Sequence, residues 1–140
     1  MANDKFADPE VIKDIVKSSK VIAVVGLSDK PDRASNRVAL YLQEAGYKII
    51  PVNPTKNKIL GEKSYPDLST IPEPVDIVDV FRRSDAVGPI VEEAILAKAK
   101  AVWFQEGVIN DRAAQQAADA GLKVVMDRCL LKEHAKLLDN

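Results

Sequence analysis

The segment VIAVVGLSDKPDRASNRV, residues 21–38, joins three kinds of sequence in one run. Residues 21–25 are apolar and mostly β-branched, which is typical of a buried strand. Gly26 and the polar residues after it indicate a loop, and apolar residues from Val38 to Ala45 then recur at helical spacing. A strand that passes through a glycine into a helix is the first half of a βαβ unit.

Short apolar runs alternate with helical segments along the rest of the chain, which predicts an α/β protein. The predicted fold is Rossmann-like and doubly wound, a mainly parallel five-stranded sheet with helices on both faces. Its first strand is expected to be central, with a ligand crevice at the carboxyl ends of the strands. The predicted strands are residues 21–25, 48–52, 76–80, 101–104 and 124–126.

Capping signals give the helix boundaries. Asp8 before Pro9 predicts a leading helix, and Ser84 is expected to cap the helix after the third strand. Another helix is predicted from Asn110 to Gly121, and a short one near the C-terminus. The segment 54–74 contains four prolines and is expected to be a long connection, with one short edge strand around residues 58–60.

Composition limits the classes of function. The 140 residues suffice for a single domain, residues 1–140, and 20 basic residues nearly balance 21 acidic ones. This balance argues against nucleic-acid or membrane partners. No apolar run at residues 1–6 or elsewhere suggests a leader or a membrane span, so a cytoplasmic location is expected. With one cysteine and one histidine, no metal site is predicted.

The loop after the first strand carries the strongest functional signal. Glycine lets the backbone approach an oxyanion, and a helix N-terminus offers free amides and a favourable dipole. Ser28 and Ser35 add hydroxyl donors, and Arg33 or Arg37 can add charge-assisted bonds. The alternative is an ordinary turn in which Gly26 serves packing and Ser35 caps the helix.

The ends of the second and third strands add polar groups at the same edge. No G-x-G-x-x-G follows Gly26, and the second strand ends in Asn53-Pro54-Thr55-Lys56 without the acid that holds the ribose of NAD. Lys56 suits a phosphorylated ribose, or is simply a solvated lysine. Phe81 and Arg82, next to Arg83, can reach a ligand across the crevice, or belong to the core and to surface ion pairs.

Three further residues raise the question of catalysis. Glu106 follows the fourth strand, where a carboxylate can act as a general base, although a structural role is more common. Cys129 and His134 are five residues apart, a spacing that turns them away from each other on a helix. Cys129 is expected to be buried and His134 to be at the surface or loosely packed, so no catalytic residue is assigned.

Four segments together resemble a known family: VIAVVGLSDKPDRASNRVALYLQEAGYKIIPVNP, PVDIVDVFRR, AVWFQEGV and MDRCLLKEH. They are similar to the small, stand-alone CoA-binding proteins of bacteria and archaea, and the resemblance covers nearly the whole chain. That family is similar in fold to the N-terminal CoA-binding domain of the succinyl-CoA synthetase α subunit. The resemblance implies that coenzyme A, or an acyl-CoA, is the ligand.

By motif position, the resemblance implies that Gly26, Ser28, Ser35 and Arg37 receive the CoA phosphates. The chain lacks the second domain of the synthetase and the histidine that becomes phosphorylated there, which argues against ligase activity.

The resemblance also implies that Asn53, Pro54 and Lys56 border the adenosine end, and that Phe81 and Arg82 belong to a loop that closes over the cofactor. The expected function is CoA or acyl-CoA binding by a non-catalytic module. The alternatives are a small acyl-CoA-handling or NADP-dependent enzyme, and a regulatory protein with a vestigial crevice.

Overall fold

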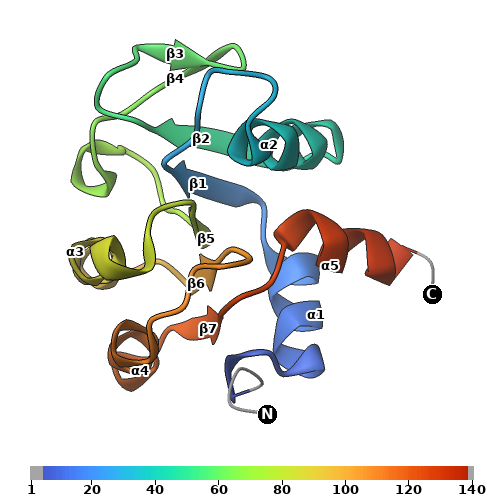
Figure 1. Ribbon diagram of the computed structural model, residues 1–140, viewed down its shortest axis with the longest axis vertical. Helices are drawn as coiled ribbons and strands as arrows, with labels where there is room; N and C mark the ends of the chain where they lie inside the picture. The colour runs from blue at the N-terminus through green and yellow to red at the C-terminus, as the bar shows by residue number, and fades with distance from the viewer. Residues whose placement is uncertain (1–4, 139–140) are drawn as a thin grey trace.

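The computed structural model describes residues 5–138 and has the predicted architecture, a five-stranded parallel sheet with helices on both faces (Figure 1). The strand order is β2-β1-β5-β6-β7. The strands of this sheet are β1 Val21–Val25, β2 Lys48–Val52, β5 Ile77–Val80, β6 Ala101–Phe104 and β7 Lys123–Val125. The helices are α1 Pro9–Ser18, α2 Ala34–Glu44, α3 Val87–Leu96, α4 Asp111–Asp119 and α5 Leu130–Leu138.

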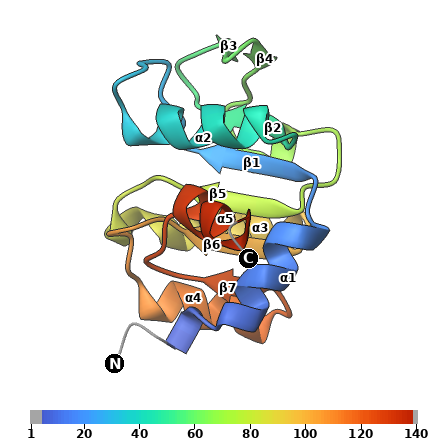
Figure 2. The same cartoon turned by 90° about the vertical axis from the view of Figure 1, so that its right-hand side faces the viewer.

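Alternating side chains of the strands fill two cores. In β1, Ala23 and Val25 face the side covered by α3 and α4, whereas Ile22 and Val24 face the side covered by α1, α2 and α5. Figures 1 and 2 show these two helical layers on either side of the sheet. Burial on both faces explains why the strands are nearly continuous in apolar character.

The winding of the sheet reverses between β1 and β5. From β1 the chain moves outward to β2 and then returns to place β5 on the other side of β1. The prediction that the first strand is central is therefore inexact: β1 is an interior strand, and β5 is the middle one. The switch point, where ligands of such folds bind, lies between the carboxyl ends of β1 and β5.

The observed N-caps agree with those predicted from the sequence at two helices and differ at a third. The side chain of Asp8 accepts from the amide of Glu10, and that of Asn110 accepts from the amide of Ala113. The prediction that Ser84 caps a helix is wrong, because a 3-10 turn, Ser84–Ala86, precedes α3. The Ser84 hydroxyl instead accepts from the amide of Ile109 at 2.9 Å, which ties together the loops after β5 and β6.

The predicted strand near residues 58–60 exists but does not extend the main sheet. β3 (Lys58–Ile59) pairs antiparallel with β4 (Glu62–Lys63) in a separate hairpin. Leu60 and Gly61 form its turn with positive φ angles of 53° and 77°. The tight turn brings β4 directly beside β3, so β3 pairs with this neighbour instead of the main sheet.

Two loops touch at the switch point. Gly26 has a φ of 86°, and a Cβ placed on it would lie 2.3 Å from the carbonyl oxygen of Phe81. The Gly26 amide also donates to the carbonyl of Val52 at 3.0 Å. A glycine is therefore required both by the backbone angle and by the close approach of the loop after β5.

One carboxyl lies inside the sheet. Asp79 of β5 is fully buried, and its Oδ1 accepts a hydrogen bond of 2.6 Å from Nε2 of Gln105. Its Oδ2 has no partner within residues 5–138. Burial raises the pKa of Asp79 to about 7, although the bond from Gln105 acts in the opposite direction.

We expect Gly26→Ala to destabilise the protein more than Gly46→Ala. Both glycines have positive φ, but a Cβ at Gly46 would meet no atom within 4 Å. The additional clash with Phe81 should cost about 1–3 kcal/mol beyond the shared backbone strain. Denaturant unfolding measures both variants, and equal losses would show that Phe81 moves aside freely.

We expect Asp79→Asn to stabilise the protein increasingly as the pH rises from 4 to 7. In this window folded wild-type protein binds a proton that the unfolded chain, with a pKa near 3.8, does not bind. The stability of the wild type therefore falls as the pH rises, by about 2–4 kcal/mol, and levels off above pH 7. Parallel pH–stability curves for the two proteins would contradict this expectation.

Candidate functional site

Two neighbouring cavities open at the carboxyl ends of β1, β2 and β5. Gly26 lines both of them, so they meet at the switch point of the sheet. The first has a volume of about 310 Å³ and the second about 330 Å³. A larger depression of about 790 Å³ lies between the outer sides of α3 and α4 and is lined mostly by polar side chains.

The first cavity has mainly apolar walls, with one cationic side chain, Arg82, and two acidic ones, Asp67 and Glu93. Its walls come from the ends of β1 and β2, the segment before the 3-10 turn η2 (Leu68–Thr70), and α3. Arg82 lines it, is exposed, and makes no hydrogen bond or ion pair with residues 5–138. Such a pocket suits a flat ring, on which a guanidinium can stack. Its apolar lining residues are Val25, Val52, Pro54, Pro66, Leu68, Ala86, Pro89 and Ile90.

The second cavity is polar and lies at the N-terminus of α2. No side chain caps this helix, and the amides of Ala34 and Ser35 donate to no group in the described part of the chain. Lys30 and Arg33 line the same cavity, together with Gly26 and Phe81. Free amides, a helix dipole and two cations make this cavity suitable for an anion.

The two serines of the first loop both support its shape. Ser35 is buried, and its Oγ accepts from the amide of Ser28 at 2.9 Å. The Ser28 Oγ accepts from the amide of Lys30 at 3.1 Å. Both serines line the second cavity, and each hydroxyl that accepts a bond still has its own hydrogen to donate.

Asn53 joins the second strand to the first loop. Its Nδ2 donates to the carbonyl of Leu27 at 2.9 Å, and its Oδ1 accepts from the amide of Thr55 at 2.9 Å. Pro54, the next residue, lines the first cavity. Asn53 therefore fixes the cavity wall, and its side-chain amide is already engaged on both sides.

Lys56 and Arg37 lie at the margins of the site. The Lys56 ammonium forms an ion pair of 3.2 Å with Asp29 of the first loop, and both side chains remain partly exposed. Arg37 lies one turn inside α2 and donates to the carbonyl of Asp32, so it lines neither cavity. Lys56 is thus held beside the cavities, whereas Arg37 braces the loop.

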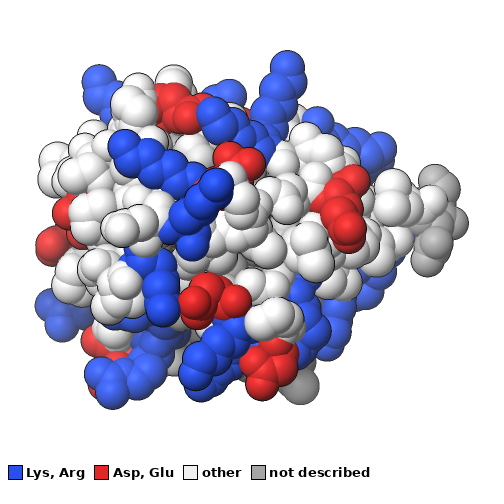
Figure 3. Space-filling model, turned by 90° about the horizontal axis from the view of Figure 1, so that it is seen from above, with Lys and Arg blue, Asp and Glu red and all other residues white. Residues whose placement is uncertain are grey.

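The charges around this end of the molecule are mixed. Figure 3, which looks down on the end capped by the β3–β4 hairpin, shows Lys and Arg side chains with acidic ones between them. This pattern agrees with a net charge of -1 and with the absence of a uniformly basic face in that view. An anion at the second cavity must therefore be held by local donors.

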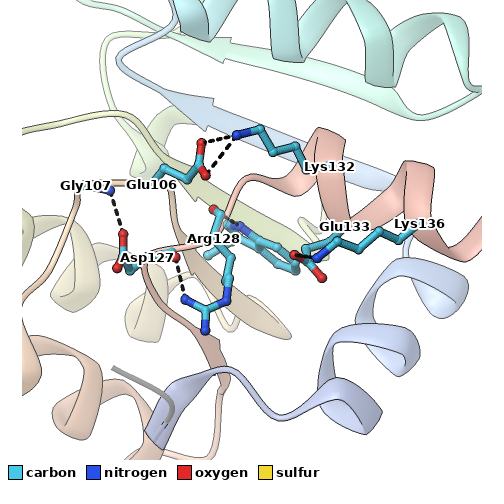
Figure 4. Close-up of polar contacts among 8 residues, drawn as sticks. Glu106, Gly107, Asp127, Arg128, Lys132, Glu133 and Lys136 are labelled. Carbon is cyan, nitrogen blue, oxygen red and sulfur yellow. Dashed lines mark hydrogen bonds and ion pairs between the residues drawn. The ribbon is translucent and has the colours of Figure 1, made fainter. Parts of the chain in front are cut away.

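A separate polar network lies beyond the carboxyl ends of β6 and β7 (Figure 4). Glu106 accepts from Lys132 of α5 at 3.0 and 3.1 Å, and the two side chains point toward each other. Asp127 has a positive φ of 59° and accepts from the amide of Gly107 at 2.8 Å. The ion pair gives Glu106 a structural partner rather than the free position of a general base.

Cys129 and His134 are directed to different surroundings. Cys129 is buried, as the sequence predicts. His134 is not loosely packed, because its Nδ1 lies 2.8 Å from the hydroxyl of Tyr41 and its ring packs edge-on against Tyr41 and Tyr47. Burial lowers the pKa of His134, which favours its neutral form.

Sequence reasoning missed several contributors to this edge. Lys30 lines the second cavity, and Pro66 and Ile90 line the first. The prolines of the segment 54–74 were the available signal for Pro66. The signal for Asp79 was an acid in the interior of an apolar run, since Ile77, Val78 and Val80 surround it.

Comparison with known proteins places the chain in a family. A family model described as CoA binding domain matches residues 20–135. The uncharacterized protein YneT of Bacillus subtilis is 48% identical over 124 residues, which cover 89% of this chain and 92% of YneT. A solved structure of a hypothetical protein from Pyrococcus horikoshii OT3 is 43% identical with a TM-score of 0.90, over 93% of this chain and 92% of that one.

Larger proteins contain a similar segment. Acetate–CoA ligase (ADP-forming) I of Archaeoglobus fulgidus is 28% identical over 121 residues, which cover 79% of this chain but 18% of the ligase.

Within residues 5–138 the structure contains no helix long and apolar enough to cross a membrane. The family match spans most of the chain, so this protein belongs to the CoA-binding domain family.

Proposed function

We propose that this protein binds coenzyme A or an acyl-CoA at the carboxyl edge of its sheet, as a binding module without chemistry of its own. The observation that carries the proposal is the meeting of a mainly apolar cavity and a polar cavity at Gly26, in a chain of this family. CoA combines a flat adenine ring with a diphosphate and a ribose phosphate, so it requires both kinds of cavity side by side.

The residues present fit the parts of this ligand. The amides of Ala34 and Ser35, with Lys30 and Arg33, would hold the diphosphate. The first cavity would hold the adenine, with Arg82 stacked on the ring.

Lys56 would meet the ribose phosphate after exchanging its partner Asp29 for the ligand. Gly26, Ser28, Asn53, Pro54 and Phe81 would shape the site, and Arg37 would act through the loop that it braces. These residues bind and orient, and none of them is proposed to form or break a bond of the ligand.

The state of the potential nucleophile and bases supports the non-catalytic part of the proposal. Cys129 is buried, Glu106 is paired with Lys132, and His134 is bonded to Tyr41. The thiol is therefore shielded from solvent, and the two potential bases are held by partners within the fold.

Thermal unfolding with added nucleotides tests the proposal directly. CoA should raise Tm, because a ligand that binds only the folded state stabilises it by about 2.7 kcal/mol at 100 times its Kd. NAD and NADP should raise Tm much less. An equal or larger rise with either nicotinamide cofactor would favour the alternative of an NADP-dependent protein.

The variant Lys56→Ala tests the ribose-phosphate contact. We expect it to weaken CoA binding by about 5- to 50-fold and dephospho-CoA binding by less than about twofold, since only CoA carries the phosphate that Lys56 would meet. Titration calorimetry measures both ligands. Lys58→Ala, in the neighbouring hairpin, is the matched control and should leave both affinities unchanged. Equal losses for the two ligands on Lys56→Ala would refute the role of Lys56.

A further inference from the structure

Asp79 is the most unusual polar group in the described structure. It lies in an interior strand, it is fully buried, and one of its carboxyl oxygens has no partner within residues 5–138. Buried polar groups are nearly always satisfied, so a carboxyl with one unpaired oxygen in the middle of a sheet needs an explanation. A contribution to stability does not explain it, because an ionised carboxyl in this dry surrounding destabilises the folded protein.

Its position links it to the ligand site. Asp79 pairs in register with Val24 of β1, two residues before Gly26, and two residues span about 7 Å along a strand. Because side chains alternate, Asp79 faces the same side of the sheet as Phe81, which lines the second cavity, at the N-terminus of α2. The carboxyl therefore lies below the floor of that cavity.

No charged neighbour sets the protonation of this carboxyl. The raised pKa of Asp79 has burial as its main cause and the bond from Gln105 as an opposing one, with no contribution from a charge. Lys30 and Arg33 stand at the mouth of the cavity above. Among the titratable side chains on this side of the sheet, Tyr41, Tyr47 and Cys129 belong to the core or pack against it, and His134 is bonded to Tyr41. The helices α1, α2 and α5 also carry charged side chains, for example Lys13, Arg37 and Lys132, which are exposed.

We propose that Asp79 couples the binding of an anionic cofactor at the α2 N-terminus to the uptake of a proton by its own carboxyl group. This inference rests on the proposed function. The negative phosphates of a bound ligand disfavour a second negative charge beneath them, and the dry interior between them screens little. Linkage is reciprocal, so protonation of Asp79 must strengthen ligand binding by the same factor.

Coulomb's law gives the scale of the expected effect. Unit charges about 10 Å apart at an effective dielectric constant near 20 interact strongly enough to change an equilibrium about tenfold. The affinity of the wild type for CoA should therefore fall about tenfold more than that of Asp79→Asn between pH 6 and pH 9. Titration of the ligand's own phosphate and thiol is common to both proteins and cancels in this comparison.

Calorimetric titration of CoA in two buffers of different ionisation enthalpy, PIPES and Tris at pH 7.5, counts the protons taken up. We expect the wild type to take up roughly half a proton more per CoA than Asp79→Asn. Asp119→Asn removes an exposed acid on α4 and is the matched control, which should behave as the wild type. Equal proton numbers in all three proteins would overturn the inference.

A measurement on the wild type removes any dependence on the folding of the variant. The NMR titration of carbon-13-labelled aspartate carboxyls should give Asp79 a higher pKa with CoA bound than without it. An unchanged titration overturns the coupling while leaving CoA binding intact. If CoA gives neither heat nor a rise in Tm, the proposed function itself fails, and the coupling fails with it.

Discussion

The contact between Gly26 and the carbonyl group of Phe81 is the constraint on which the site depends. It fixes the distance between the loops that leave β1 and β5, the strands between which the winding of the sheet reverses. On one side of this contact lies an apolar cavity, and on the other lies the open N-terminus of α2. A bulkier residue at position 26 would push the loops apart and separate the two halves of the site.

Side-chain hydrogen bonds hold the loop after β1 in shape. A loop that presents free amides to a ligand must be held by something else, and here side chains perform that task. Ser35 accepts from the amide of Ser28, and Asn53 reaches across from β2 to the carbonyl of Leu27. The loop is thus arranged before any ligand arrives, which lowers the entropy that binding must overcome.

The sequence predicts the fold well and the site less completely. Buried strands such as 101–104 are recognisable because their hydrophobic pattern is a local property, and caps such as Asn110 act within one turn. Ser84 was misassigned because its hydroxyl bonds to Ile109, a partner that lies 25 residues away in the chain and that local rules do not contain. The pairing of Lys56 with Asp29 was hidden for the same reason.

The contacts of each side chain in the structure also decide which substitutions report on ligand binding. Ser35 and Asn53 hold the loop in place, so their removal would lower affinity even if neither side chain touched the ligand. Arg82 has no partner within residues 5–138, and Lys56 is tied only through an exposed ion pair, which contributes little to stability. A loss of affinity at these two basic residues, without a loss of stability, therefore reflects contact with the ligand rather than damage to the fold.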